Sequence, residues 1–150
     1  MKIISGGQTG VDRAALDVAL SLGVSSGGFC PAHRLAEDGI IPERYPLEEL
    51  PDGGYPERTE RNVSAADGTV IFHRGPLTGG TKATGELCRE RRKPCLLLNA
   101  NVVSAEEAAG QLSKFVREKG LAVINVAGPR ASQWPEGYDF VFAALQKFLT

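Results

Sequence analysis

The first 22 residues of the chain combine a short apolar run, a glycine-rich turn and an amphipathic stretch. Ile3 and Ile4 form the apolar run, and residues 5–10 (SGGQTG) form the turn. Over residues 11–22 the apolar side chains recur at helical spacing, which predicts a helix directly after the turn. A strand, a tight turn and a helix in this order are typical of α/β proteins, whose helices cover a mostly parallel sheet.

The glycine-rich turn is also a candidate ligand site. At a strand–turn–helix junction, free backbone N–H groups and the positive end of the helix dipole favour an anion such as phosphate. Glycine lets the backbone approach such a group closely, and Gln and Thr add side-chain donors. The candidate ligand-binding residues of this first turn are Gly6, Gly7, Gln8, Thr9 and Gly10. An ordinary turn that binds nothing is the alternative interpretation, and it stays open at this point.

Length and charge restrict the class of protein. The chain has 150 residues, 42% of them hydrophobic, which predicts a single domain over residues 1–150 with a full core. Its 17 basic and 18 acidic residues give a net charge of −1, which argues against a nucleic-acid-binding surface built on bulk positive charge. A local pocket for an anion is compatible with this balance.

The sequence also predicts a cytoplasmic location. No apolar run approaches the roughly 20 residues that span a membrane, and a first strand that begins at Lys2 leaves no room for a leader peptide. The three cysteines, Cys30, Cys88 and Cys95, form no CxxC pair and fit reduced thiols. The two histidines are too poorly accompanied for a metal site, so we expect no protein-bound metal.

Strands and helices alternate along the rest of the chain. Further strands are predicted at 26–30, 69–72, 95–98 and 122–127, and further helices at 55–66, 82–92, 105–119 and 135–149. Five strands alternating with helices predict a five-stranded, mostly parallel sheet that is covered on both faces. Residues 32–56 are rich in Pro, Gly and charge, and form either a functional or mobile loop or a solvated excursion.

Three of the five predicted strands end in unusual loops. GGQTG follows the first strand, TGGT the third and GPRAS the fifth. Because ligands of parallel sheets bind beyond the carboxyl ends of the strands, a shared site requires these three strands to be neighbours. We therefore predict the spatial order 2-1-5-3-4, with the apolar strand 122–127 inserted centrally. The rival order, 2-1-3-4-5, would separate GPRAS from the other two loops.

The second and third of these loops add candidates for a phosphate site. The residues concerned are Thr78, Gly79, Gly80, Thr81 and Lys82 in one loop, and Gly128, Pro129, Arg130 and Ser132 in the other. Backbone N–H groups at a helix start, hydroxyls and a planar guanidinium all suit phosphate. Thr81 as a plain helix-start residue and Arg130 as a surface arginine are the alternatives. Asp12 is expected to cap the first helix.

The motifs of the chain resemble one family over almost the whole length. In chain order they are GGQTGVDRAALDVA, EDG, YP, ERTERNV, DGTVIF, GGTKAT, KP and NVAGPR. They are similar to those of the family named putative molybdenum carrier proteins, the circularly permuted YpsA-like branch of the SLOG superfamily. This resemblance implies a Rossmann-like three-layer fold, a nucleotide-like ligand and a homodimer whose helices pair across the flank of the sheet.

The same superfamily contains the lonely-guy-type phosphoribohydrolases, once labelled lysine decarboxylases, which remove the base from nucleoside 5′-monophosphates. Relative to them the chain looks rotated, because its last strand and helix resemble their first, and this again implies the order 2-1-5-3-4. Their catalytic arginine and glutamate match Arg58 and Glu86 by spacing. Their motif has Gly-Thr where this chain has Lys82-Ala83, which weakens the case for catalysis and leaves phosphate binding plausible.

Two functions follow from the residues and the resemblance. The first is binding of a phosphate-bearing, nucleotide-like ligand; the family name suggests the molybdenum cofactor, whose pterin carries a phosphate. No cluster of Cys or His selects molybdenum itself. The second is cleavage of the N-glycosidic bond of a nucleoside 5′-monophosphate. In that case Arg58 would clamp the substrate and Glu86 would act as acid or base near an oxocarbenium-like transition state.

Overall fold

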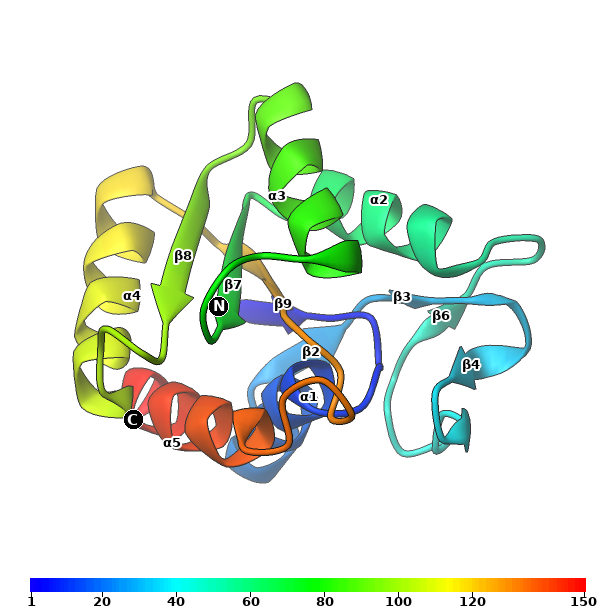
Figure 1. The fold of residues 1–150 in the computed structure, drawn as a ribbon, viewed down its shortest axis with the longest axis horizontal. Coiled ribbons are helices and arrows are strands. Elements are labelled where there is room, and N and C mark those ends of the chain that lie inside the picture. The colour runs from blue at the N-terminus through cyan, green and yellow to red at the C-terminus, as the bar shows by residue number, and fades with distance from the viewer.

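The computed structural model describes residues 1–150 and contains a central five-stranded sheet (Figure 1). Its strands, in spatial order, are β2 (Ser25–Gly27), β1 (Lys2–Ile4), β9 (Val123–Ala127), β7 (Gly68–His73) and β8 (Cys95–Asn99). All neighbouring strands are parallel. Numbered along the chain, these five strands have the order 2-1-5-3-4, so the predicted order is confirmed and the rival order is excluded.

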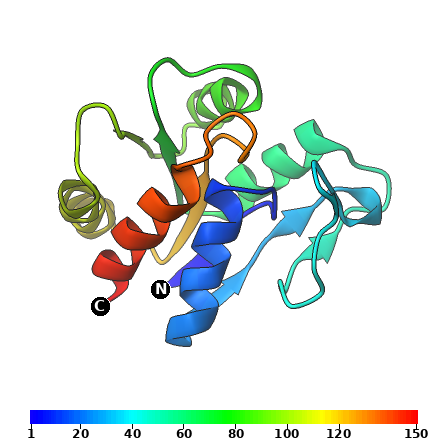
Figure 2. The same ribbon diagram turned by 60° about the horizontal axis from the view of Figure 1, so that its bottom comes forward.

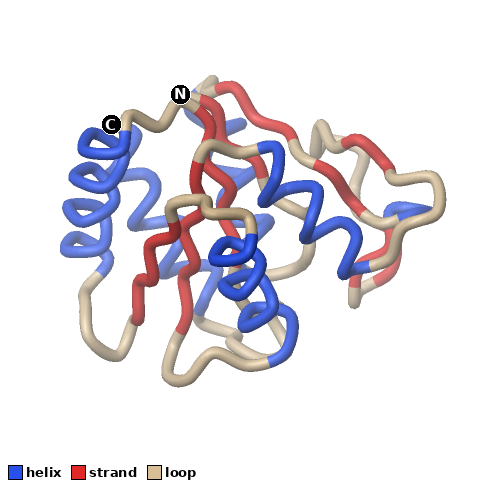
Figure 3. The backbone as a smooth tube through the Cα atoms, turned by 90° about the horizontal axis from the view of Figure 1, so that it is seen from above, coloured by secondary structure: helices blue, strands red, loops and turns tan.

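Helices cover both faces of the sheet and complete the predicted three-layer arrangement. On one face α1 (Val11–Leu22), α4 (Ala105–Lys119) and α5 (Gly137–Leu149) pack together, and on the other lie α2 (Tyr55–Ala65) and α3 (Gly79–Glu90). Figure 2 shows α1 and α5 side by side against the sheet. In Figure 3 the central strands run between the helices.

The main core lies between the sheet and helices α1, α4 and α5. It is a cluster of 18 buried residues that includes Ile3, Phe72 and Ile124 from the strands and Leu112 and Leu145 from the helices. Strand β7 is buried along its whole length, as expected for a strand covered on both faces. This packing fixes the relative positions of the strand ends from which the three loops depart.

The helix ends follow the local sequence signals. Helix α4 begins after Ser104, whose hydroxyl accepts the N–H of Glu107 while the Glu107 carboxylate accepts the N–H of Ser104. It ends at Gly120, and α1 ends at Gly23; these two glycines have φ values of 64° and 66°. None of the helices is long and apolar enough to cross a lipid bilayer.

The strand predicted at 26–30 is divided in two at Gly28. This residue has a φ of 129°, and a Cβ here would lie 2.1 Å from the carbonyl oxygen of Ser5, so only glycine fits. After Gly28, strand β3 (Phe29–Cys30) leaves the central sheet and pairs in parallel with β6 (Glu48–Glu49). The prediction of one continuous strand was therefore wrong.

Residues 31–54, which we call the extension, are folded. They contain the 3₁₀ turn η1 (Ala32–Arg34), the antiparallel pair β4 (Leu35–Ala36) and β5 (Gly39–Ile40), and β6. Figures 1 and 3 show the extension at one end of the molecule, beyond β2. Of the two alternatives for this segment, the solvated excursion does not fit, because residues of the segment are buried in a hydrophobic cluster.

Buried side chains and one arginine hold the extension together. Ile41 and Tyr45 are fully buried with Leu16 of α1 in a second hydrophobic cluster. The guanidinium of Arg34 donates to the carbonyl oxygens of Ile41 and Tyr45 at 3.1 Å each, and also to that of Pro42. The extension is thereby anchored to α1, the helix that follows the first glycine-rich turn.

Candidate functional site

A cavity of about 770 Å³ opens at the carboxyl ends of β1 and β9, between α2 and α3. The predicted site residues that line it are Gly6, Gln8, Arg58, Gly79, Gly80, Thr81, Glu86, Gly128, Pro129 and Arg130. All three glycine-rich loops are represented among them. The loops therefore meet at one pocket, which is the geometry that the predicted sheet order requires.

The remaining predicted site residues do not line this cavity: they are Gly7, Thr9, Gly10, Thr78, Lys82 and Ser132. Lys82 is exposed on α3, and Thr78 lines a smaller cavity next to the first. Helix α3 begins at Gly79 and not at the predicted residue 82, so Thr78 is its N-cap residue and Lys82 already belongs to the helix.

Gly7 and Gly10 permit close packing of backbone instead of contact with the cavity. Their φ values are 82° and 80°. A Cβ on Gly7 would lie 2.5 Å from the side chain of Leu47, and a Cβ on Gly10 would lie 2.9 Å from the backbone nitrogen of Ala131. These two glycines therefore let the first loop pack against the extension and against the third loop.

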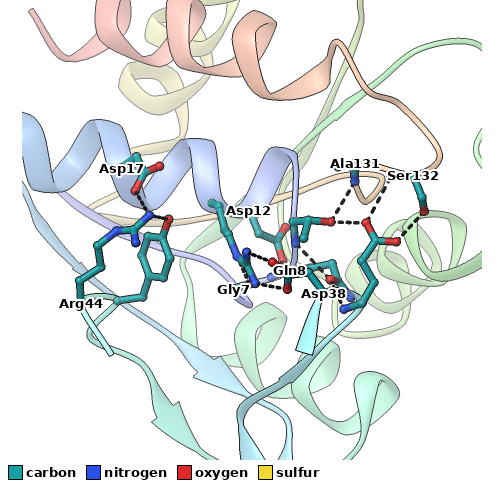
Figure 4. Close-up of polar contacts among 12 residues, drawn as sticks. Gly7, Gln8, Asp12, Asp17, Asp38, Arg44, Ala131 and Ser132 are labelled. Atoms are coloured by element: carbon teal, nitrogen blue, oxygen red, sulfur yellow. Dashed lines mark hydrogen bonds and ion pairs between the residues drawn. The ribbon is translucent and has the colours of Figure 1, made fainter. Parts of the chain in front are cut away.

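Thr9 and Ser132 converge on the carboxylate of Glu37 in the extension. Figure 4 labels Gln8, Ala131 and Ser132 of this network. Both hydroxyls donate to this carboxylate, and so does the N–H of Ser132. The Thr9 hydroxyl in turn accepts the N–H of Ala131 at 3.0 Å. The hydrogen bonds from Ser132 and then from Thr9 lower the pKa of Glu37, against a smaller opposing effect of burial. One side chain of the extension thus joins the first and third loops.

Gln8 is oriented by the same network. Its Oε1 accepts the N–H of Thr9 at 3.1 Å and the N–H of Glu37 at 2.9 Å. The side chain is only 7% exposed and lines the cavity. Because Oε1 is engaged, the Nε2 amide group is the end of Gln8 that is free to donate to a ligand.

Arg58 and Asp12 form a buried ion pair at the cavity wall. Arg58 Nη1 lies 3.7 Å from Asp12 Oδ2 and donates to the carbonyl oxygen of Gly6 at 3.0 Å. Burial raises the pKa of the Asp12 carboxyl, and the Arg58 charge acts in the opposite direction. Asp12 is not the helix cap that we expected: the N-cap is Gly10, and Asp12 accepts the N–H of Gln8 at 3.1 Å.

The amino-terminal end of α3 presents unpaired donors to the cavity. The N–H groups of Gly79, Gly80 and Thr81 open the helix and have no intrahelical acceptor, and Thr78 makes no side-chain cap. A Cβ on Gly79 or Gly80 would meet nothing within 4 Å, so the space beside these groups is open. This combination of free N–H groups, helix dipole and space suits an oxyanion.

The charges of the cavity are unevenly distributed. Arg130, whose side chain is 42% exposed, lines the cavity near the loops and lies 3.7 Å from Glu37. Glu86 and Glu90 lie one to three helical turns further along α3. The end of the cavity formed by the loops is therefore the better place for an anionic group.

Several polar lining residues were missed at the level of sequence, among them Asn125 and Gln133. Asn125 lies in the central strand β9, is 3% exposed, and donates through Nδ2 to the Thr69 hydroxyl at 3.3 Å. Gln133 follows the third loop and lines both the large and the small cavity. The signal for Asn125 was present, because one amide interrupts the otherwise apolar run at 122–127.

The cavity carries donors for an organic oxyanion but no ready-made metal ligands. The structure contains no group of three or more His, Cys, Asp or Glu side chains that could hold a metal ion. Backbone N–H groups, amides and guanidinium groups are the donors that the loops present.

Two comparisons place the chain among known proteins. Residues 3–149 match the model of the circularly permutated YpsA SLOG family. The crystal structure of a protein named "Putative molybdenum carrier protein" from Syntrophus aciditrophicus SB is similar, with a TM-score of 0.97 and 44% sequence identity. The similarity covers 99% of this chain and 94% of that one. Among curated proteins no match is found.

Proposed function

Because the chain belongs to the circularly permuted YpsA family of SLOG proteins, as its motifs predicted, we propose that its cavity binds a phosphate-bearing, nucleotide-like ligand. The ligand's phosphate contacts the amino-terminal end of α3, and its organic part lies in the cavity of about 770 Å³. The volume is in the range of small-molecule sites, roughly 300–1,000 Å³.

The observation that carries this proposal is the hydroxyl of Thr81. The residue is 8% exposed and lines the cavity, and its Oγ1 has no hydrogen-bond partner within the protein. Every side-chain oxygen that is sealed from solvent has a hydrogen-bond partner, so the Thr81 hydroxyl is accessible and available to a ligand. Thr81 follows Gly79 and Gly80 in the first turn of α3, whose free N–H groups line the same cavity, so this turn offers both backbone and side-chain donors.

The first and third loops supply the remaining contacts in this proposal. Gln8 offers its Nε2 amide, and Arg130 offers a guanidinium that can bind a phosphate in bidentate fashion. Asn125 offers a carboxamide from the central strand to the organic part of the ligand. Arg58 is already paired with Asp12, so it contributes less positive charge than its position suggests.

The molybdenum cofactor fits this site through its phosphate. The donors at α3 are those that a phosphate on a pterin requires, and the cavity has room for an organic ring beside them. The protein named for molybdenum in Syntrophus aciditrophicus shares 44% of its residues with this chain. No cluster of side chains could bind the metal itself, so in this proposal the protein recognises the cofactor through its phosphate and pterin.

A second candidate function is supported by Arg58 and Glu86, which line the same cavity. These two positions match the catalytic arginine and glutamate of phosphoribohydrolases by spacing. In a hydrolase the Glu86 carboxylate would stabilise the cation that develops on the ribose as the base leaves. Arg58 already donates to the carbonyl oxygen of Gly6 and pairs with Asp12. This favours ligand binding over hydrolysis as the function of the cavity.

Thermal unfolding with nucleoside 5′-monophosphates tests the proposal. A ligand at 100 times its dissociation constant stabilises a protein by about 2.7 kcal/mol, which raises Tm by several degrees for a chain of this size. We expect adenosine or guanosine monophosphate to raise Tm with increasing concentration, and the unphosphorylated nucleosides to leave it unchanged. Equal shifts by nucleoside and nucleotide would reject the phosphate assignment.

A further inference from the structure

A second, smaller cavity of about 190 Å³ adjoins the first. Both cavities are lined by Thr81, Pro129 and Gln133, so these residues form a common wall. The start of α3 lies between the two cavities, because Gly79 and Gly80 line the large one and Thr78 lines the small one. A phosphate held at this helix end would have space on both sides.

The small cavity contains a buried imidazole with one free nitrogen. His73, the last residue of β7, is 7% exposed, and its Nδ1 lies 2.7 Å from the carbonyl oxygen of Gly75. A carbonyl oxygen only accepts, so Nδ1 carries a hydrogen, and in the neutral imidazole Nε2 then carries the lone pair. Nε2 has no hydrogen-bond partner in the protein. Every side-chain nitrogen that is sealed from solvent has such a partner, so Nε2 is accessible.

The imidazole is held in place before any ligand arrives. Gly75, which accepts from His73, itself donates to Oδ1 of Asn99 at 3.2 Å, and the same oxygen accepts the N–H of Asn101. Gly75 has a φ of 75°, a conformation that fixes the tight turn after β7. The ring therefore presents an acceptor at a fixed position in the cavity.

Two opposite charges, both on side chains that are more than half exposed, line the small cavity. Arg74 lies 4.0 Å from Glu136 and donates through Nε to Asn101 at 3.1 Å. The other walls include Trp134 and Pro129. The lining also includes the polar side chains of Thr78, Thr81 and Gln133, so the small cavity suits a neutral polar group that carries O–H or N–H donors.

We propose that the small cavity binds the second arm of a two-armed ligand, in which a sugar hydroxyl or a heterocycle N–H donates to Nε2 of His73. This inference rests on the proposed phosphate site at α3, and specifies the ligand as a phosphate or pyrophosphate that bears organic groups on both sides. The large cavity takes one arm, and the small cavity takes the other.

Calorimetric titration with adenosine diphosphate and ADP-ribose tests the proposal, because the two probes share the nucleoside and the diphosphate and differ in the second arm. We expect the wild-type protein to bind ADP-ribose about tenfold more tightly, equivalent to roughly 1.4 kcal/mol. On titration with ADP-ribose the ¹⁵N resonance of His73 Nε2 is expected to shift upfield.

Two substitutions of His73 separate binding from folding. In His73→Asn the amide nitrogen can replace Nδ1–H toward Gly75 while Nε2 is lost, so the preference for ADP-ribose should vanish and ADP affinity should stay within about twofold. His73→Gln returns a polar group near Nε2 and should recover part of the preference. His33→Asn is the matched control, since His33 has a φ of 63°, which asparagine tolerates, and lies outside both cavities.

The outcomes distinguish this inference from the proposed function. Equal affinities of wild type for ADP and ADP-ribose would overturn the second-arm site and leave the phosphate site intact. A preference that persists in His73→Asn, or a His73 resonance that does not respond to ADP-ribose, would overturn it as well. If wild type binds neither probe, the proposed function fails and this inference fails with it.

Discussion

Two hydrogen bonds join Glu37 to Ser132, although 95 residues separate them in the chain. The Ser132 hydroxyl donates to Oε1 at 2.6 Å, and the Ser132 N–H donates to Oε2 at 3.2 Å. Thr9 donates to the same carboxylate. The extension therefore sets the positions of the first and third loops, from which Gln8 and Arg130 reach the cavity.

Glu37→Gln is expected to lower the free energy of unfolding by about 1–2 kcal/mol near neutral pH, because bonds to a charged acceptor become bonds to a neutral amide. The folded state lowers the pKa of Glu37 below its ordinary value of 4.5. The stabilisation is therefore complete above that value, and is lost as the pH falls through the folded-state pKa. Urea denaturation at several pH values should show wild type and variant converging in acid.

Glu43→Gln is the matched control for this measurement. Glu43 is exposed in the same extension and forms neither an ion pair nor a side-chain hydrogen bond, so its substitution should change the free energy of unfolding by less than about 0.5 kcal/mol at any pH. If Glu37→Gln changed the free energy of unfolding as little as Glu43→Gln, the hydrogen bonds to Glu37 would not stabilise the protein.

Arg58→Met is expected to destabilise the protein by about 3 kcal/mol near neutral pH, because it leaves the buried carboxylate of Asp12 without its opposite charge. Burial already raises the pKa of Asp12 above 3.8, and loss of Arg58 raises it further. A raised carboxyl pKa makes stability fall as the pH rises above the ordinary value, so the penalty should shrink in acid. Urea denaturation of wild type and Arg58→Met at several pH values measures this penalty.

The double variant Asp12→Asn/Arg58→Met checks the cause of that penalty. With the carboxylate removed, most of the loss seen in Arg58→Met should be recovered, since no unpaired charge remains. A double variant as unstable as Arg58→Met alone would show that the guanidinium acts through packing and its bond to Gly6, and not through Asp12.

Wild-type protein is expected to bind adenosine monophosphate without releasing adenine, which chromatography of the incubated nucleotide can measure. Glu86→Gln and Glu90→Gln should then release no more and no less adenine than wild type. The two variants are a matched pair, because both carboxylates lie along α3 in the same cavity. Adenine release that Glu86→Gln abolishes and Glu90→Gln retains would instead identify a hydrolase with Glu86 at its centre.

The sheet order could be predicted because function and topology impose the same constraint. Loops that share a ligand must depart from neighbouring strands, and placing GPRAS beside GGQTG and TGGT leaves 122–127 as the central strand. Helix ends such as Ser104 and Gly120 could also be predicted, because their signals are local. The glycine loops, the apolar strands and the helical spacing all predict the same alternation of strands and helices.

The site could be predicted only in part, because some of its contacts depend on residues far apart in sequence. Nothing local shows that Glu37 meets Ser132, or that Gly28 passes the carbonyl oxygen of Ser5 and sends β3 out of the sheet. The division between glycines that line the cavity and glycines that pack backbone is equally non-local. Gly80 and Gly10 look alike in the sequence, but Gly10 has a φ of 80° and packs against the third loop, whereas a Cβ on Gly80 would meet nothing within 4 Å.

Gly80→Ala tests the central claim most directly, with Gly110→Ala of α4 as its control. A Cβ at either position meets nothing within 4 Å, and alanine favours a helix over glycine by about 0.5–1 kcal/mol, so both variants should be at least as stable as wild type. We expect the dissociation constant for adenosine monophosphate to rise about tenfold or more in Gly80→Ala and to stay within about twofold in Gly110→Ala. Equal affinity in all three proteins would contradict a phosphate site at the start of α3.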